Sequence, residues 1–341
     1  SPDRFTASMT RFAAVSPDGR QVSLESLAKL YVKPMGAGAP RALTRGDEGF
    51  ELFPAWSRDG KTIAYVAWTD AGLGHIRVIG AGGGASREVT KDPGHYGHLA
   101  FSPDGKILAF EKRAAGGLTA PTWAENPGVY RVAVAGGAPV RVARDADSPQ
   151  FGVSNDRLFM QVSEKGKLSL ISTNLDGDKR RVHATGDLVA DYSVSPDEQY
   201  FAFRQNAEVN VMPLMPGPQD VPVDLKGGPM PVTKVSAGGA DYLNWSNGGA
   251  QLHWSDGPTV FTAAADALFA AGPAGESPAK FQPPTARPHG GSTRETTPPS
   301  TYSPRHGGQR RRVSTPSTSP STCTAGWVPT SPTRCTATSC G

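Results

Sequence analysis

The hexapeptide FSPDGK at residues 101–106 recurs along this chain with small changes, which indicates a protein built from repeats. Five further copies keep the serine and parts of the turn that follows it: VSPDGR at 15–20, WSRDGK at 56–61, VSNDR at 153–157, VSPDEQ at 194–199 and WSNGG at 245–249. The serines stand at 16, 57, 102, 154, 195 and 246, so successive copies lie 41 to 52 residues apart. A period of this length is typical of a supersecondary unit that stacks on copies of itself.

Each copy has the chemistry of a β-hairpin. An apolar run precedes the second copy at 54–56, and an alternating run follows it at 62–66, as expected for half-buried strands. Between the runs, proline presets φ, aspartate can bond the nearby backbone and glycine accepts a positive φ. We therefore interpret the repeated acids as turn formers rather than acid–base catalysts: Asp18, Asp59, Asp104 and Asp197. The tryptophans that precede two of the serines are interpreted as packing residues between units: Trp56 and Trp245.

Two more strands complete each unit. In the second copy a third strand is expected at 75–79, followed by a glycine-rich turn at 82–84 and a short fourth strand at 87–90. Four strands in 40 to 50 residues is the period of a propeller blade, and such sheets cover their faces by stacking around an axis. Six copies predict an all-β, six-bladed β-propeller over residues 1–275. The sixth copy is the weakest, and the segment Phe5 to Met9 could supply its closing strand.

The charge of the chain is uneven. Residues 281–341 contain seven arginines and one acid, a net charge of +6, whereas the whole chain carries +4. The first 280 residues are therefore mildly acidic, at −2, and their charge gives no reason to expect a nucleic-acid partner. The chain holds no run of eighteen apolar residues, so no membrane insertion is expected.

The repeat pattern stops before the C-terminal residues 276–341. Ser, Thr and Pro make up 32 of the 61 residues from 281 onward, and all three cysteines lie here: Cys323, Cys335 and Cys340. Such a composition cannot bury enough apolar surface to offset the entropy of ordering, which predicts a disordered tail. An abrupt enrichment in Pro, Arg, Thr, Ser and Cys is also what a GC-rich gene gives out of frame. Both interpretations stay open, and sequencing the parent gene would separate them.

The repeats resemble those of the TolB-like family, the propellers similar to the Tol-Pal translocation protein B. In this family the blades carry a Trp/Phe-Ser-Pro-Asp-Gly-Lys hairpin and a downstream Gly-Gly and Leu-Thr. The resemblance covers residues 10–262, is closest in the second and third copies, and is weakest in the fourth and sixth. The opening RFAAVSPDG at 11–19 looks most like the propellers that precede bacterial metal-dependent amidohydrolase domains.

The resemblance implies two kinds of function and one location. TolB-like propellers occur alone, as modules that bind a protein or peptide partner. They also precede catalytic domains in amidohydrolases and in prolyl-oligopeptidase-like peptidases. By the same resemblance the protein is expected to be periplasmic or secreted.

The sequence lacks the usual catalytic signatures. It contains no G-x-S-x-G elbow, no H-E-x-x-H, no P-loop and no H-x-H pair, so we predict no catalytic residue, no metal and no cofactor. The glycines at 80–84 resemble a dinucleotide fingerprint, but the same turn recurs in other copies and no helix pattern follows it. His95 and His98 form an H-x-x-H pair with too few ligands for structural zinc, and Arg310–Arg312 are interpreted as a solvated charge run.

One surface can be predicted from the repeats alone. The innermost strand of each blade begins at one mouth of the central channel, so residues four to six before each repeated serine should ring that mouth. Counting back gives a polar ring with one member from each copy: Arg11, Glu51, His98, Ser148, Asp191 and Asp241. One interpretation is that these residues are polar only because the mouth of the channel is exposed to water. The functional alternative is a site for a cationic or peptide ligand, or a docking face for a partner.

Two functions follow from these observations. The first is a non-enzymatic scaffold or binding module for a protein or peptide, which forms the propeller part of a larger exported hydrolase. The rival is a truncated hydrolase of the amidohydrolase or prolyl-oligopeptidase type, whose covalently linked catalytic domain is missing from this chain. An assay of the purified chain for amide hydrolysis, with and without added zinc, would distinguish the two.

Overall fold

The computed structural model describes most of the repeat region. The described residues are 11–44, 49–113, 126–217, 220–223, 225, 230–236 and 238–269, and all belong to the first of two units into which contacts divide the chain, 1–288. The segment Phe5–Met9 and the predicted tail 276–341 lie outside them.

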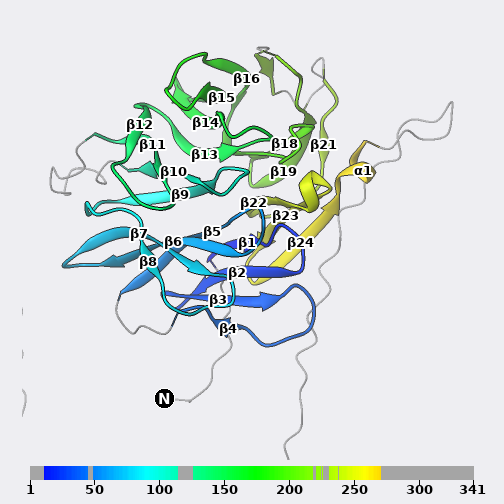
Figure 1. Ribbon diagram of the computed structural model, residues 1–341. Coiled ribbons are helices and arrows are strands. Elements are labelled where there is room, and N and C mark those ends of the chain that lie inside the picture. Colours follow the sequence, from blue (N-terminus) through cyan, green and yellow to red (C-terminus); the bar gives the residue numbers. More distant parts are fainter. Residues whose placement is uncertain are drawn as a thin grey trace, which may run out of the picture. The chain divides into compact units, whose positions relative to one another are not determined.

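The described strands form six antiparallel sheets, one for each repeat, which are the blades of a β-propeller (Figure 1). Blade 1 contains β1 (Arg11–Val15), β2 (Gln21–Ser26), β3 (Lys29–Pro34) and β4 (Arg41–Ala42). Blade 2 contains β5 (Phe50–Trp56), β6 (Thr62–Thr69), β7 (Leu73–Gly80) and β8 (Arg87–Glu88). Blade 3 contains β9 (Tyr96–Phe101), β10 (Ile107–Lys112), β11 (Gly128–Ala133) and β12 (Val140–Ala143).

The second half of the ring is less regular. Blade 4 contains β13 (Asp147–Phe151), β14 (Arg157–Glu164), β15 (Lys167–Asn174) and β16 (Arg181–Asp187), and β20 (Val221–Pro222) joins it in parallel. Blade 5 contains β17 (Val189–Val194), β18 (Tyr200–Gln205), β19 (Glu208–Pro213) and β21 (Thr233–Lys234). Within the described residues, blade 6 has three strands, β22 (Asp241–Ser246), β23 (Gln251–Asp256) and β24 (Thr259–Ala264), followed by the short helix α1 (Ala265–Leu268). The predicted all-β, six-bladed propeller is confirmed.

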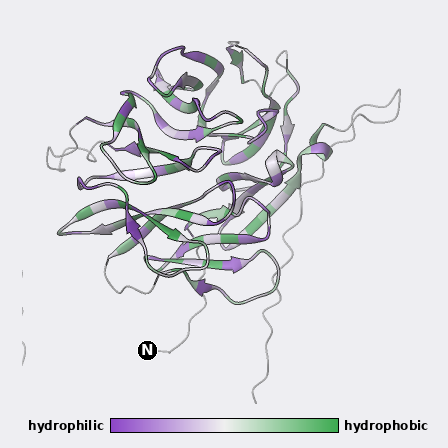
Figure 2. Cartoon of the chain, in the orientation of Figure 1, coloured by the Kyte–Doolittle hydropathy of each residue, from purple (hydrophilic) through white to green (hydrophobic). Residues whose placement is uncertain are grey.

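Hydrophobic side chains gather between successive blades. Green and purple residues alternate along many strands in Figure 2, which gives each sheet apolar side chains to bury. Six buried clusters are present among the described residues, and each joins two neighbouring blades. The cluster between blades 1 and 6 is the smallest, with Ala13, Val15 and Val22 at its centre. The ring is therefore closed by packing, most thinly where its two ends meet.

Hydrogen bonds also close the ring between blades 1 and 6. The backbone N–H of Val15 donates to Oδ1 of Asn244 at 3.0 Å, and the backbone N–H of Asn247 donates to the carbonyl of Pro17 at 2.7 Å. The side-chain oxygen of Asn244 in blade 6 thus accepts a backbone N–H of β1 in blade 1. None of the helices in the described parts of the chain has the length and apolar character needed to cross a membrane.

The repeated turns are built as their chemistry predicts. In blade 3, Ser102 Oγ donates to Asp104 Oδ1 at 2.7 Å and accepts the backbone N–H of Ile107 at 3.0 Å. The turns at Ser16, Ser57 and Ser195 repeat these bonds. The serine hydrogen bond is the main reason that the pKa of each of three aspartates lies below its usual value: Asp18, Asp59 and Asp104. The interpretation of these acids as turn formers is confirmed.

The tryptophans before the serines lie between blades, as expected. Trp56 Nε1 donates to the carbonyl of Ala14 in blade 1 at 3.0 Å, and Trp245 Nε1 donates to the carbonyl of Ser193 in blade 5 at 3.2 Å. Each indole thus satisfies its one donor in the preceding blade while its ring covers apolar surface.

The prediction that Ser154 is the repeated serine of blade 4 is wrong. Phe151 pairs with Leu158 as Phe101 pairs with Leu108, so in blade 4 the place of the repeated serine belongs to Gly152 and not to Ser154. Ser154 instead bonds Asp156 two residues further on. The sequence suggested Ser154 because a Ser-Asn-Asp turn survives there, shifted by two residues.

Candidate functional site at the channel mouth

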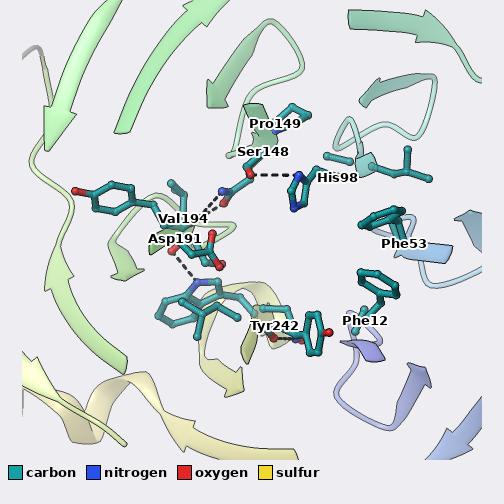
Figure 3. Close-up of a pocket in the computed structure, with 18 of the residues that line it drawn as sticks. Phe12, Phe53, His98, Ser148, Pro149, Asp191, Val194 and Tyr242 are labelled. Carbon is teal, nitrogen blue, oxygen red and sulfur yellow. Dashed lines mark hydrogen bonds between the residues drawn. The ribbon is translucent and has the colours of Figure 1, made fainter. Parts of the chain in front are cut away.

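The innermost strands of the six blades enclose a central cavity of about 820 Å³. Every blade contributes its first strand to the wall, and blades 3, 4 and 5 add side chains from their second strands. This volume lies within the range of about 300 to 1,000 Å³ that is common for ligand pockets. Figure 3 shows side chains from several blades converging on the cavity.

A β-bulge interrupts five of the six innermost strands at the same step. The residue four positions before the repeated serine, or before Gly152, there has a positive φ: Phe12 (52°), Phe53 (54°), His98 (42°), Ser148 (49°) and Tyr242 (56°). In β17 the same position is held by Asp191, and the shift in pairing comes just before it. A bulge re-aims a side chain, and here it brings one residue from each blade to the cavity (Figure 3).

One side of this ring is aromatic. The ring centroids of Phe12 and Phe53 lie 4.3 Å apart, and those of Phe12 and Tyr242 lie 5.6 Å apart. The guanidinium of Arg113 lies 4.9 Å from the centroid of Phe53. Blades 1, 2 and 6 therefore give the cavity a continuous aromatic wall.

The other side is polar. His98 Nδ1 lies 2.5 Å from Glu111 Oε2, and Arg113 Nε lies 3.3 Å from the same oxygen. Burial would raise the pKa of Glu111, but the hydrogen bond and charge of His98, with the charge of Arg113, hold it below its usual value. Arg204 in turn pairs with Asp241. Both arginines near this end of the cavity are thus matched with a carboxylate.

Two further carboxylates have no such match. Asp191 accepts a hydrogen bond from Gln161 Nε2 at 3.1 Å, and Asp147 is bonded by Ser148. Within the described ranges, neither forms an ion pair. Burial is the main reason that the pKa of both carboxyl groups lies above the usual value. The negative charge of Glu111 adds to the shift of Asp147, and the negative charge of Asp147 adds to the shift of Asp191, whereas the charges of His98 and the nearby arginines oppose both shifts.

The predicted mouth residues divide into two groups. His98, Ser148, Asp191 and Asp241 line the cavity, and Arg11 and Glu51 do not. Glu51 is 5% exposed, and its carboxylate accepts the backbone N–H of Leu30 at 2.8 Å. Its role is therefore structural, since it joins blade 2 to blade 1. The guanidinium of Arg11 lies over the ring of Phe12, 5.0 Å from its centroid, and forms an ion pair with Glu25.

The aromatic members were missed. Each copy has a polar residue four to six positions before its predicted serine, whereas the bulge fixes the cavity-lining position at four before the repeated serine, or before Gly152. Aligning the copies on that position alone would have found three aromatic residues: Phe12, Phe53 and Tyr242.

The far end of the cavity is crossed by one side chain. Arg58 stands in the turn of blade 2, where three other copies have proline. Its guanidinium donates to the carbonyls of Phe151 and Gly152 in blade 4, both at 2.8 Å. Burial lowers the pKa of Arg58, and the negative charge of Glu198 opposes this effect. A departure from the repeat has thus produced a bond between blades that are not neighbours.

We expect Arg58→Ala to lower the free energy of unfolding by about 1–3 kcal/mol, because hydrogen bonds from a charged donor to two carbonyls are lost. Urea denaturation followed by tryptophan fluorescence measures the change. Lys61→Ala is the control, since Lys61 belongs to the same turn but its side chain is 82% exposed. Equal, small effects of both substitutions would show that the bonds of Arg58 contribute nothing.

The other candidate motifs lead to no second site. The ring centroid of His95 lies 4.7 Å from that of Trp68, with the ring planes tilted by 47°, whereas His98 faces Glu111, so the two histidines do not converge. In the part of the chain that the structure describes, no three His, Cys, Asp or Glu side chains are grouped to hold a metal ion. Gly80 and Gly83 form a backbone turn between β7 and β8, bonded at 2.8 Å. Arg310–Arg312 lie outside the described residues.

Two buried serine–histidine pairs were not anticipated. Ser172 Oγ lies 2.7 Å from His183 Nε2, and Ser246 Oγ lies 2.8 Å from His253 Nε2. His183 is 7% exposed and His253 is 1% exposed, so no substrate can reach them. Burial lowers the pKa of each histidine to about 4. The pairs are neutral parts of the sheets, not catalytic dyads.

Comparison with known proteins supports the fold. A family described as the TolB beta propeller domain matches residues 7–215. A putative TolB from Agrobacterium tumefaciens is 20% identical with a TM-score of 0.53, over 69% of this chain and 84% of that one. TolB from Acinetobacter baumannii is 16% identical with a TM-score of 0.53, over 76% of this chain and 61% of that one.

A gluconolactonase from Xanthomonas campestris is also similar. It is 16% identical, with a TM-score of 0.53, over 75% of this chain and 85% of that one. At these identities the likeness concerns the fold, which carries both binding modules and enzymes. No curated protein matches this chain by sequence.

Proposed function

Because this chain belongs to the TolB β-propeller family, we propose that it is a non-enzymatic binding module that receives a segment of a protein or peptide in its central cavity. One observation carries the proposal: each of the six blades directs the residue at the same step of its innermost strand to the cavity wall. A non-glycine residue with positive φ is unfavourable, and such strain clusters where a protein binds a ligand.

The chemistry of the wall also favours a peptide. Aromatic faces, an imidazole, hydroxyl groups and carboxylates surround one space. A peptide segment offers both apolar side chains and backbone groups to such a wall, and aromatic anchors in a concave site are typical of protein recognition.

The finer parts of the proposal concern location and context. A periplasmic or secreted location, and a role as the propeller part of a larger exported hydrolase, agree with the family and with the resemblance of residues 11–19. Assaying the purified chain for amide hydrolysis with and without zinc tests the rival function, since zinc-dependent turnover would contradict a purely binding role.

Selection of a random heptapeptide display library on the folded chain tests the proposal. We expect the selected peptides to lose at least tenfold in affinity for Phe53→Arg, because a bulky cation would replace part of the aromatic wall. Val153→Arg is the matched control, since Val153 is 60% exposed in the β13–β14 turn and does not line the cavity. Peptides that bind Phe53→Arg and the control equally well would exclude the cavity as the binding site.

A further inference from the structure

We propose that the segment bound in the cavity carries a lysine or arginine side chain, whose cation lies against Asp147 and Asp191 and whose alkyl stem lies against the aromatic wall. This inference rests on the proposed function and names the chemistry of its ligand.

The charges around the cavity mouth point to a cation. Four carboxylates line this part of the cavity, against two arginines. Arg113 is paired with Glu111 and Arg204 with Asp241, so the arginines neutralise those two acids. Asp147 and Asp191 are the two acids of this group that form no ion pair within the described residues, and both are partly withdrawn from water. The charges of His98 and the two arginines act on them, but less strongly than burial does. A cation that reaches a buried carboxylate stabilises its charged form, so these two acids are suited to pair with a cationic group of a ligand.

The aromatic wall is an independent observation that defines the rest of the ligand. Figure 3 shows Asp191 on one side of the cavity and Phe12 and Phe53 on the opposite side. A cation close to an aromatic face is attracted by the negative charge density of that face. A long alkyl stem buries apolar surface while its charged end stays with polar groups. A metal ion would use the carboxylates and leave the aromatic wall without a role.

The protein already shows this chemistry in its own residues. The guanidinium of Arg113 lies over Phe53 while its Nε faces Glu111. A cationic side chain held between an aromatic ring and a carboxylate is thus stable at this mouth. In the proposed complex the side chain of the ligand takes up the same kind of position, between the carboxylate of Asp191 and the ring of Phe12.

The heptapeptide selection described above also tests this inference. The leading peptide is synthesised in matched forms, in which arginine is replaced by the neutral isostere citrulline and lysine by norleucine. We expect lysine or arginine in the selected peptides, and a loss of at least tenfold in affinity when it is neutralised. Asp147→Asn with Asp191→Asn should give a similar loss while keeping the shape of the cavity.

Two controls separate the effect of the cation from effects of net charge and of folding. Glu164→Gln with Asp176→Asn changes the net charge by the same amount away from the cavity and should leave affinity unchanged. The neutral peptides test the inference on the unmodified protein, whatever the acid variants do to folding. Peptides that need Phe53 but bind equally well without their cation would overturn the inference and leave the proposed function standing. Peptides that do not need Phe53 would overturn both.

Discussion

Lowering the pH from 7.5 to 4.5 should remove several kcal/mol from the free energy of unfolding of this propeller. Two buried histidines are responsible. His253 lies between Ser246 Oγ and Thr262 Oγ1, each 2.8 Å away, and His183 lies against Ser172. Burial lowers the pKa of both to about 4, whereas the usual value is about 6.5.

The direction of the effect follows from proton binding. Below about pH 6.5 the unfolded chain binds a proton at each histidine, and the folded chain does not until about pH 4. Acid therefore favours the unfolded state across this window, by up to about 3 kcal/mol for each histidine. Asp147 and Asp191 oppose the trend, since a raised pKa in the folded state adds stability as these groups become protonated. The pKa values of the turn aspartates are lowered in the folded state, so the stability that they contribute is lost only below about pH 3.8, outside this window.

Urea denaturation at pH 7.5, 6.5, 5.5 and 4.5 measures this dependence. The double variant His183→Gln with His253→Gln should flatten the curve between pH 6.5 and 4.5, although it lowers stability at pH 7.5. A wild-type curve without slope in this range would show that the folded histidines are free to take up protons. An equal slope in the double variant would assign the effect to other groups.

Replacing Trp245 by alanine should lower the free energy of unfolding by about 3–5 kcal/mol. Trp245 is 8% exposed, packs in the cluster between blades 5 and 6, and donates its indole N–H to Ser193. Truncation leaves a large cavity and an unpaired carbonyl. Trp245→Phe keeps most of the ring and loses the hydrogen bond, so it should cost about 1–2 kcal/mol.

The same urea titration at neutral pH distinguishes the two substitutions. A loss below about 1 kcal/mol for Trp245→Ala would mean that blade 6 contributes little to the cooperative unit. Similar losses for the alanine and phenylalanine variants would place the effect in the hydrogen bond rather than in packing.

The number of blades and the form of their turns could be predicted from the sequence because they depend on local chemistry that is repeated. Ser102, Asp104 and Gly105 define one turn, and the copies repeat it. Where a copy departs from the repeat, local residue types can predict the wrong register. Around Gly152 the surviving Ser-Asn-Asp turn suggested a phase two residues too late, and only the pairing of Phe151 with Leu158 corrects it.

The site could be predicted only in part because it depends on backbone geometry and on distant contacts. A one-residue bulge decides whether Phe12 or Arg11 reaches the cavity, and no feature of the residue types reveals it. The bonds of Arg58 join blade 2 to blade 4, 93 and 94 residues along the chain. The parallel strand β20, which leaves blade 5 to join blade 4, is likewise a non-local pairing.

The position of Arg58 gives the cavity an electrical polarity along its axis. Asp147 and Asp191, which form no ion pair among the described residues, lie near one entrance, and the guanidinium of Arg58 lies across the other. A positively charged group entering beside Asp191 is attracted at first and then repelled as it moves deeper. For the partner segment proposed above, this polarity favours entry of a chain end or a loop from the carboxylate side and opposes passage of a basic chain through the whole cavity.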